Sequence, residues 1–195
     1  MILNQAADIR TGIVVARKKA TSNNPNNKLY KMINLKCINE KGYIKFENTE
    51  VLETEELISK DFQTQIGDII VRLSAPYTAA IIHDAKEEGY IIPSHFAIIR
   101  ADNKRVVPEY LLWLIRSSRV QQQIRKNNSG SSGFGTISSG FFVNLEIQLP
   151  PIERQQRIGK MLLLSEREQE LLYKLAEEKS KYANALFEII NKPED

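Results

Sequence analysis

The segment LPPIERQQRIGKMLLL, residues 149–164, decides how this chain is organised. A proline disfavours helical backbone at the residue before it, so the two prolines keep the chain extended, and Pro151 then suits the first turn of a helix. Glu153 follows at the positive end of that helix. The segment therefore predicts a change from a globular part, residues 1–149, to one long helix in residues 150–195.

Apolar side chains recur along this helix with a period of seven residues. An uninterrupted helix from Ile152 to Ile190 would be about 58 Å long at ~1.5 Å per residue, too long for a compact domain of the preceding residues to cover. We expect part of it to extend beyond the domain and to pair with another helix, because an apolar stripe is unstable alone in water. The predicted pairing residues are Ile158, Met161, Leu162, Leu172, Leu175, Tyr182, Leu186 and Ile189.

The heptad columns are not purely apolar. One column contains Ile158, Ser165, Leu172, Lys179 and Leu186, and the other contains Met161, Glu168, Leu175, Tyr182 and Ile189. Seven of these ten residues are apolar, and the three polar ones indicate a short or irregular coiled coil. A helix lying wholly on its own domain is the alternative, and the oligomeric state stays open.

Composition limits the class of protein. The chain has 195 residues, 42% of them apolar, which is enough for one domain with a sizeable core and an appendage. The single cysteine, Cys37, excludes an internal disulfide framework, and the N-terminus does not resemble a signal segment. No apolar run approaches the roughly 20 residues that cross a bilayer. We therefore expect a cytoplasmic protein with no membrane role.

Short apolar runs broken by turn residues fill the globular part and predict an α+β fold, with a mixed, β-rich domain followed by the long helix. Strands are expected in residues 30–46 around a turn that ends at Gly42, in 66–73, in 79–100 on either side of a loop, and in 141–149. One helix is expected over residues 106–127, with Pro108 in its first turn. The Gly- and Ser-rich residues 128–140 predict a loop.

In the helix expected over residues 106–127, the predicted core-facing side chains are Leu111, Leu112, Ile115, Val120 and Ile124.

No set of residues points to catalysis. The Gly-Phe-Gly at residues 133–135 lacks the strand and helix of a nucleotide-binding turn. His83 and His95 have no partners at metal-ligand spacing, and neither nearby serine lies in a Gly-x-Ser-x-Gly elbow. Asp84 and its two following glutamates fit a charged hairpin tip better than a nuclease centre. We expect a non-catalytic binding module without metal or cofactor.

Three polar groups supply donors that bind phosphates or base edges. They lie in residues 17–24, 72–78 and 125–132. Residues 1–150 carry 19 Lys and Arg against 15 Asp and Glu, and the remainder carries 8 against 9, which allows nucleic acid as a partner without requiring it. For each group, a solvated loop is the alternative. The predicted nucleic-acid-binding residues are Arg17, Lys18, Lys19, Arg72, Ser74, Tyr77, Thr78, Arg125, Lys126, Ser131 and Ser132.

Four motifs follow one another in a recognisable order. They are Gly-Asp-Ile at residues 67–69, Pro-x-Tyr-Leu at 108–111, Gly-Ser at 130–131, and Pro-Pro-x-x-x-Gln-x-x-Ile at 150–158. In this order and spacing, the chain resembles the DNA-specificity (S) subunits of type I restriction-modification systems. The similarity runs from about residue 7 to the end of the sequence.

The resemblance implies a target-recognition domain in residues 1–149 and a conserved helical region in 150–195. Such subunits usually carry two of each, reading two halves of a bipartite DNA site, with the helices acting as spacer and as docking surface for methylation (M) subunits. With one of each, this chain resembles half of a subunit. The simplest completion is a homodimer with antiparallel helices on double-stranded DNA, and a second specificity chain is the alternative partner.

The resemblance thus implies a non-catalytic subunit that directs adenine methylation, and restriction where a translocating restriction (R) subunit is present, to a specific site. Two alternatives come from other classes. One is a protein–protein adaptor in which the coiled coil does the work without DNA specificity. The other is a self-contained enzyme, which the missing catalytic set disfavours.

Overall fold

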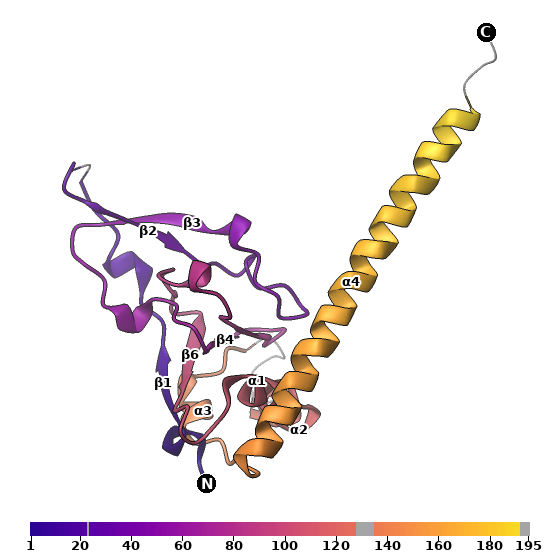
Figure 1. Ribbon diagram of the computed structural model, residues 1–195. Coiled ribbons are helices and arrows are strands. Elements are labelled where there is room, and N and C mark those ends of the chain that lie inside the picture. Colours follow the sequence, from indigo (N-terminus) through magenta and orange to yellow (C-terminus); the bar gives the residue numbers. More distant parts are fainter. Residues whose placement is uncertain (23, 128–134, 192–195) are drawn as a thin grey trace. The chain divides into compact units, whose positions relative to one another are not determined.

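The structure, a computed structural model, describes residues 1–22, 24–127 and 135–191. The chain divides into two compact units, Met1–Gly159 and Lys160–Asp195. The long helix α4, Ile152–Ile190, begins in the first unit and runs through the second (Figure 1). Its first residue directly follows Pro151, as the double proline predicts.

A four-stranded antiparallel sheet forms the centre of the first unit, with strand order β1-β6-β4-β5. The four strands are β1 (Ala7–Thr11), β4 (Asp68–Arg72), β5 (Ala79–Ile81) and β6 (Phe96–Ala101). Every residue of β4 except Arg72 is buried, because neighbours cover both faces of this central strand. The predicted strand after Gly67 is therefore confirmed, with Gly67 at a φ of 86°.

A second sheet pairs β2 (Lys28–Met32) with β3 (Glu50–Thr54). In Figure 1 these two strands run across the strands of the larger sheet. Leu52 and Met32 are buried from this sheet and pack with Ile13, Ile58 and Ile91. Val51 and Leu29 point to the other face and remain exposed, as the period-two alternation of a strand requires.

Helices cover the larger sheet. Helix α1 (Pro108–Arg116) packs on β4, β5 and β6, α2 (Ser118–Asn127) packs on α1, and α3 (Ser139–Val143) packs on β1. The predicted core-facing residues of the 106–127 segment are buried, as expected: Leu111, Leu112, Ile115, Val120 and Ile124. Short 3-10 turns lie at Leu3–Gln5, Val15–Arg17, Phe46–Asn48, Lys60–Phe62 and Ala85–Glu87.

The single helix predicted over residues 106–127 is wrong, because the structure has two. Ser117 separates them with extended backbone, at φ −60° and ψ 147°. Its hydroxyl donates to the carbonyl of Leu114 at 2.6 Å, so the side chain competes for a helical acceptor. No proline or glycine marks this break, and the apolar period continues across it.

Two predicted strands are also wrong. Residues 33–46 form turns with a single bridge between Ile38 and Ile44, and the partner of β2 is the more distant β3. The turn itself is confirmed, since Gly42 adopts a φ of 83°. Residues 141–149 contain the end of α3 and one bridge from Glu146. The sheets are antiparallel rather than mixed, with parallel pairing only at isolated bridges among the described residues.

An ion pair joins β4 to β6 inside the sheet. Asp68 and Arg100 are direct neighbours in the strand register. Arg100 donates from Nε to Asp68 Oδ1 at 2.7 Å and from Nη2 to Oδ2 at 2.8 Å. Asp68 is fully buried, and its hydrogen bonds raise the pKa of the Arg100 guanidinium. The bidentate geometry fixes the register at the point where the Gly-Asp-Ile motif enters the sheet.

We predict that Arg100→Ala lowers the free energy of unfolding by about 3–5 kcal/mol, because it leaves the Asp68 carboxylate buried without its cation. Arg10→Ala, which removes ion pairs to the half-exposed Asp8 and Asp61, should cost less than about 1 kcal/mol. Urea unfolding followed by the fluorescence of Trp113, the only tryptophan, measures both. Equal losses in the two variants would contradict the assignment.

Candidate nucleic-acid interface and pairing helix

The first group of predicted nucleic-acid contacts, residues 17–24, lies beside the C-terminal end of β3. Lys18 Nζ donates to Glu56 Oε2 at 3.0 Å, and Thr21 donates from its backbone N–H and its hydroxyl to Glu55 Oε1. The bonds from Thr21 lower the pKa of Glu55. This loop is thus held in place by acidic residues, and its three exposed cations are Arg17, Lys18 and Lys19.

The second group follows β4. The Arg72 guanidinium turns back onto the chain, donating from Nη2 to the Ala75 carbonyl at 3.2 Å and from Nη1 to the Ile38 carbonyl at 3.5 Å. Burial lowers its pKa. Arg72 Nε and Thr78 Oγ1 are buried and have no hydrogen-bond partner among the described residues. Two polar atoms of this loop therefore keep unused hydrogen-bonding capacity.

Tyr77 has a supporting position in the same loop. It is 7% exposed, it adopts a φ of 56° in the left-handed region, and its hydroxyl donates to the Gly135 carbonyl at 2.7 Å. A second bond, from Ile137 N–H to the Leu73 carbonyl at 2.8 Å, lies nearby. Left-handed backbone costs about 1 kcal/mol or more outside glycine, so the packing of the ring must stabilise it. Ser74 is partly buried in this loop.

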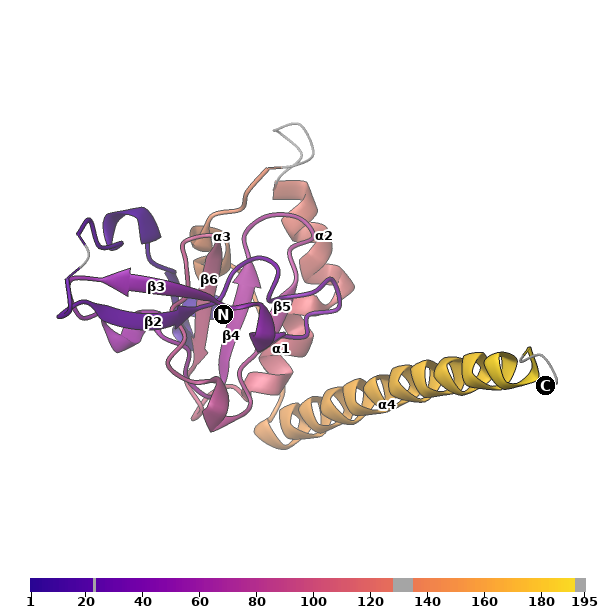
Figure 2. The same cartoon turned by 90° about the horizontal axis from the view of Figure 1, so that it is seen from above.

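The third group lies at the C-terminal end of α2, where Arg125 and Lys126 are exposed. Ser131 and Ser132, predicted for the same group, lie outside the described residues. The bonds from Tyr77 and Ile137 place the second group beside the segment that follows the third. In both views of the first unit, β2 and β3 lie on the opposite side from α2 (Figure 1 and Figure 2), so the first group is separate.

Gln155 explains why the chain turns into α4 where it does. Its side chain is 2% exposed and bonds three backbone groups. Oε1 accepts from Val107 N–H at 3.0 Å, while Nε2 donates to the Pro150 carbonyl at 2.9 Å and to the Arg105 carbonyl at 3.3 Å. The first turn of α4 is thereby joined to the chain entering α1. The motif spacing contained this residue, but its role was not predicted.

Gly159, one turn after Gln155, allows α4 to approach α1 closely. A Cβ atom built at Gly159 would lie 2.9 Å from the Cβ of Glu109. Only glycine fits this distance without displacement of α1. Gln155 and Gly159 are buried on one face of α4. At about 100° per residue, the centre of the predicted pairing stripe is roughly 140° around the helix from them.

Most of the predicted pairing residues are exposed in this chain. Their exposure runs from 39% at Leu186 to 69% at Met161, and Ile158 and Leu162 are partly buried. Single exposed apolar residues are ordinary, but a series of them along one side of a helix marks an interaction surface. The exposed residues of the predicted set are Met161, Leu172, Leu175, Tyr182, Leu186 and Ile189.

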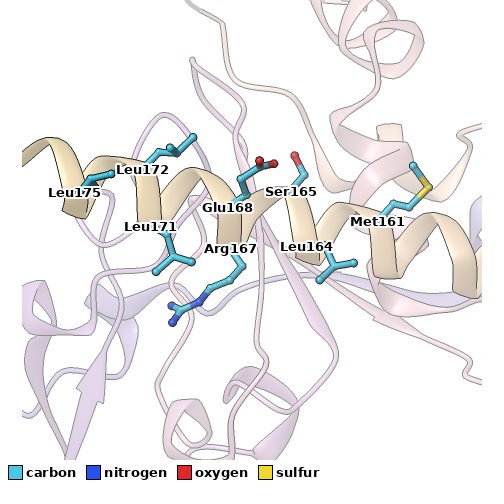
Figure 3. A pocket seen from close by; sticks show the side chains of 8 residues that line it. All are labelled: Met161, Leu164, Ser165, Arg167, Glu168, Leu171, Leu172 and Leu175. Carbon is cyan, nitrogen blue, oxygen red and sulfur yellow. The ribbon is translucent and has the colours of Figure 1, made fainter.

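A shallow groove of about 680 Å³ runs along part of the stripe (Figure 3). Leu164 and Leu171, which the heptad columns missed, lie on one side of it, and Leu172 lies on the other. Their seven-residue separation was the available sequence signal. The remaining lining residues are Met161, Ser165, Arg167, Glu168 and Leu175. Its apolar side chains suit another apolar helix better than a small polar ligand.

Two other kinds of site are absent from the residues that the structure describes. Within residues 1–22, 24–127 and 135–191, no group of three or more His, Cys, Asp or Glu side chains is placed to hold a metal ion. In the same part of the chain, no helix combines the length and apolarity needed to cross a membrane.

Comparison with known proteins decides the family. A family model described as the type I restriction modification DNA specificity domain matches residues 13–177. The chain belongs to this family. The resemblance inferred from the motif order is thus confirmed. A similar curated protein is the putative type I restriction enzyme MjaX specificity subunit of Methanocaldococcus jannaschii, 23% identical over 158 residues. That alignment covers 79% of this chain and 36% of the relative.

Solved structures share the fold of this specificity-domain chain. One, from work on complex assembly and conformational transition of the type I R-M system, has a TM-score of 0.68 at 20% identity and aligns 97% of this chain with 48% of its own. The HsdS subunit of Thermoanaerobacter tengcongensis gives 0.64 at 20%, over 95% and 46%. The S subunit of M. genitalium gives 0.59 at 15%, over 98% and 46%. The α+β fold class with a long C-terminal helix is confirmed, and the chain spans about half the length of these structures.

Removing the Gln155 bridge tests the anchoring of α4. We predict that Gln155→Leu lowers the free energy of unfolding of the first unit by about 1–3 kcal/mol, because it leaves three partly buried backbone groups without their partner. Gln156→Leu, at the exposed neighbouring position, should change it by less than about 0.5 kcal/mol. Thermal and urea unfolding of the full chain compare the two, and an equal effect would contradict the bridge.

Proposed function

We propose that this chain is a non-catalytic, sequence-reading subunit of a type I restriction-modification complex. The first unit binds double-stranded DNA, and the stripe on α4 pairs with a second helix. Methylation of adenine belongs to M subunits that the assembly brings to the site, and restriction belongs to an R subunit where one is present. Membership of the specificity-domain family is the observation that carries this proposal.

The charge and placement of the polar groups support DNA as the partner of the first unit. Arg17, Lys19 and Lys126 are exposed cations on loops or at a helix end, where phosphates can reach them. The second group adds the unpaired buried atoms of Arg72 and Thr78. Base reading requires donors and acceptors of this kind beside phosphate contacts, because phosphates alone carry no sequence information.

The exposed stripe supports pairing. Leu172 and Leu175 are each more than half exposed at the centre of the stripe. Covering them removes apolar area from water, which stabilises an assembly by roughly 25 cal/mol per Å². With two copies related by a twofold axis, each reading unit takes an identical half-site, so the DNA site is an inverted repeat with a fixed central gap. Pairing with a different specificity chain would give two unlike half-sites.

The same stripe also favours a second candidate function, a protein–protein adaptor without DNA specificity. An apolar helix surface is all that such an adaptor needs. It makes no use of the exposed cations, so the two candidates differ in how binding depends on DNA sequence and salt.

We predict salt-dependent, sequence-specific DNA binding. The double variant Lys19→Glu/Lys126→Glu should reduce the slope of log K against log salt by about 1 for each lost phosphate contact. Lys86→Glu, an equally exposed cation outside the three groups, is the matched control and should leave the slope unchanged. Fluorescence anisotropy on specific and random duplexes, with and without M subunit, provides the measurement.

Equal affinity for every duplex, alone and with M subunit, would contradict the sequence-reading role. A slope that changes equally in the Lys86 variant would show that only total charge matters. Turnover of nucleic acid by the purified chain alone would contradict its non-catalytic assignment.

We predict that replacing Leu172, Leu175 and Leu186 together by asparagine abolishes helix pairing while the first unit stays folded. The particle mass should fall from twice 22.3 kDa to 22.3 kDa. All three side chains are exposed in the single chain, so their loss acts on association. Lys174→Asn/Glu177→Asn, on the opposite face, is the control. Sedimentation equilibrium measures the mass, and an unchanged mass in the leucine variant would remove the pairing proposal.

A further inference from the structure

Several charged residues of α4 outside the stripe form ion pairs within the helix: Arg167 with Glu170 at 2.7 Å, Lys174 with Glu170 at 2.6 Å, and Lys181 with Glu177 at 3.2 Å and Glu178 at 2.8 Å. The stripe contains two charges, Glu168 and Lys179, both exposed. Neither forms an ion pair with another described residue. These two charges interrupt the surface that pairing must cover.

One antiparallel arrangement of two copies satisfies both charges. When Leu172 of one copy lies opposite Leu175 of the other, the twofold axis passes between these leucines, and the remaining positions of the two heptad columns follow by symmetry. Glu168 then lies opposite Lys179 twice. The other opposed pairs are Ser165 with Tyr182, Met161 with Leu186, and Ile158 with Ile189. In this register, the ten positions pair charge with opposite charge, apolar with apolar, and one hydroxyl with another.

The groove in Figure 3 fits this register. Its lining from Met161 to Leu175 faces residues 172–186 of the second copy. Tyr182 and Leu186 of that copy would supply apolar side chains along the groove. Glu168, one of its polar lining residues, would meet the partner's Lys179, so this charge has a matching group on the same segment.

Other arrangements leave the charges unmatched. A slip of one heptad in either direction places Glu168 opposite Leu172 or Leu186, and Lys179 opposite Met161 or Leu175. A charge covered by an apolar side chain loses hydration without gaining a partner. A parallel pair places Glu168 opposite itself and Lys179 opposite itself, which juxtaposes like charges.

We infer that Glu168 and Lys179 fix the register of an antiparallel pair and select a second copy of this chain as the occupant of the stripe. This inference rests on the pairing part of the proposed function. The leucines provide the association, and the two charges specify which alignment and which partner are accepted, as single polar positions do in coiled coils.

Charge-reversed variants test partner selection. Glu168→Lys alone and Lys179→Glu alone should each raise the dissociation constant of the homodimer by about tenfold or more, a cost of at least about 1.4 kcal/mol. The double variant E168K/K179E should restore self-association. The double variant should also bind the unmodified chain weakly, because the mixed antiparallel pair has two like-charge contacts. A parallel pair predicts the reverse, with mixed dimers preferred. Mass-tagged chains resolve the species by native mass spectrometry, and circular dichroism confirms that each variant folds.

Cysteine cross-linking tests the register itself. A chain with Ser165→Cys is mixed in turn with chains carrying Leu175→Cys, Tyr182→Cys or Ile189→Cys. Only the Tyr182 partner should form the disulfide rapidly, since the Cβ atoms must lie about 3.5–4.5 Å apart. The unmodified chain is the control, because Cys37 is buried and burial raises the pKa of its thiol. Fastest cross-linking to position 175 or 189 would indicate a slipped register. Rapid cross-linking between two chains that both carry Ser165→Cys would indicate a parallel pair.

Each of these contrary results would overturn this inference. None of them bears on DNA reading, which the measurement of DNA binding against salt tests separately. A slipped or parallel cross-link keeps pairing but removes the assigned register. A chain that stays monomeric at every concentration removes pairing with itself, whereas loss of sequence-specific binding with the register intact would remove only the reading role.

Discussion

The side chain of Gln155 is the connection on which the organisation of this chain depends. Its amide satisfies the backbone of Val107 at the start of α1 and of Pro150 just before α4. The two prolines set an extended approach, and Gly159 lets the helices come close. One face of α4 is thereby used within the first unit. Another face of the same helix carries the apolar stripe, most of whose residues are exposed in the single chain.

Local rules predicted the elements whose signals are local. Pro151 and the heptad period gave the bounds of α4, and Gly67 with its apolar run gave β4. Ser117 shows the limit of periodicity, because a hydroxyl that competes for a backbone acceptor breaks a helix without any glycine or proline. The pairing of β2 with β3 was missed, since its partners are separated by a long irregular segment that no local pattern describes.

Residue type predicts where the polar loops lie, but it does not predict which hydrogen bonds each side chain makes. Residue type predicts Tyr77 as a contact for nucleic acid, and in the structure its hydroxyl donates to the carbonyl of Gly135. The guanidinium of Arg72 donates hydrogen bonds to the backbone carbonyls of Ile38 and Ala75. Such roles depend on which distant backbone groups lack partners, and only the folded chain shows this. The exposure of Lys19 and Lys126 could be predicted from residue type, because a lysine in water needs no partner from the rest of the fold.

The heptad spacing of the stripe has a consequence for DNA geometry. Antiparallel helices that keep the stripe covered can slide only by whole heptads, which is about 10 Å of helix. Along B-form DNA this corresponds to roughly three base pairs at about 3.4 Å each. In the proposed homodimer, the separation between the two first units would therefore change only in steps of one heptad, and the positions of Glu168 and Lys179 would set the length of DNA between the two half-sites.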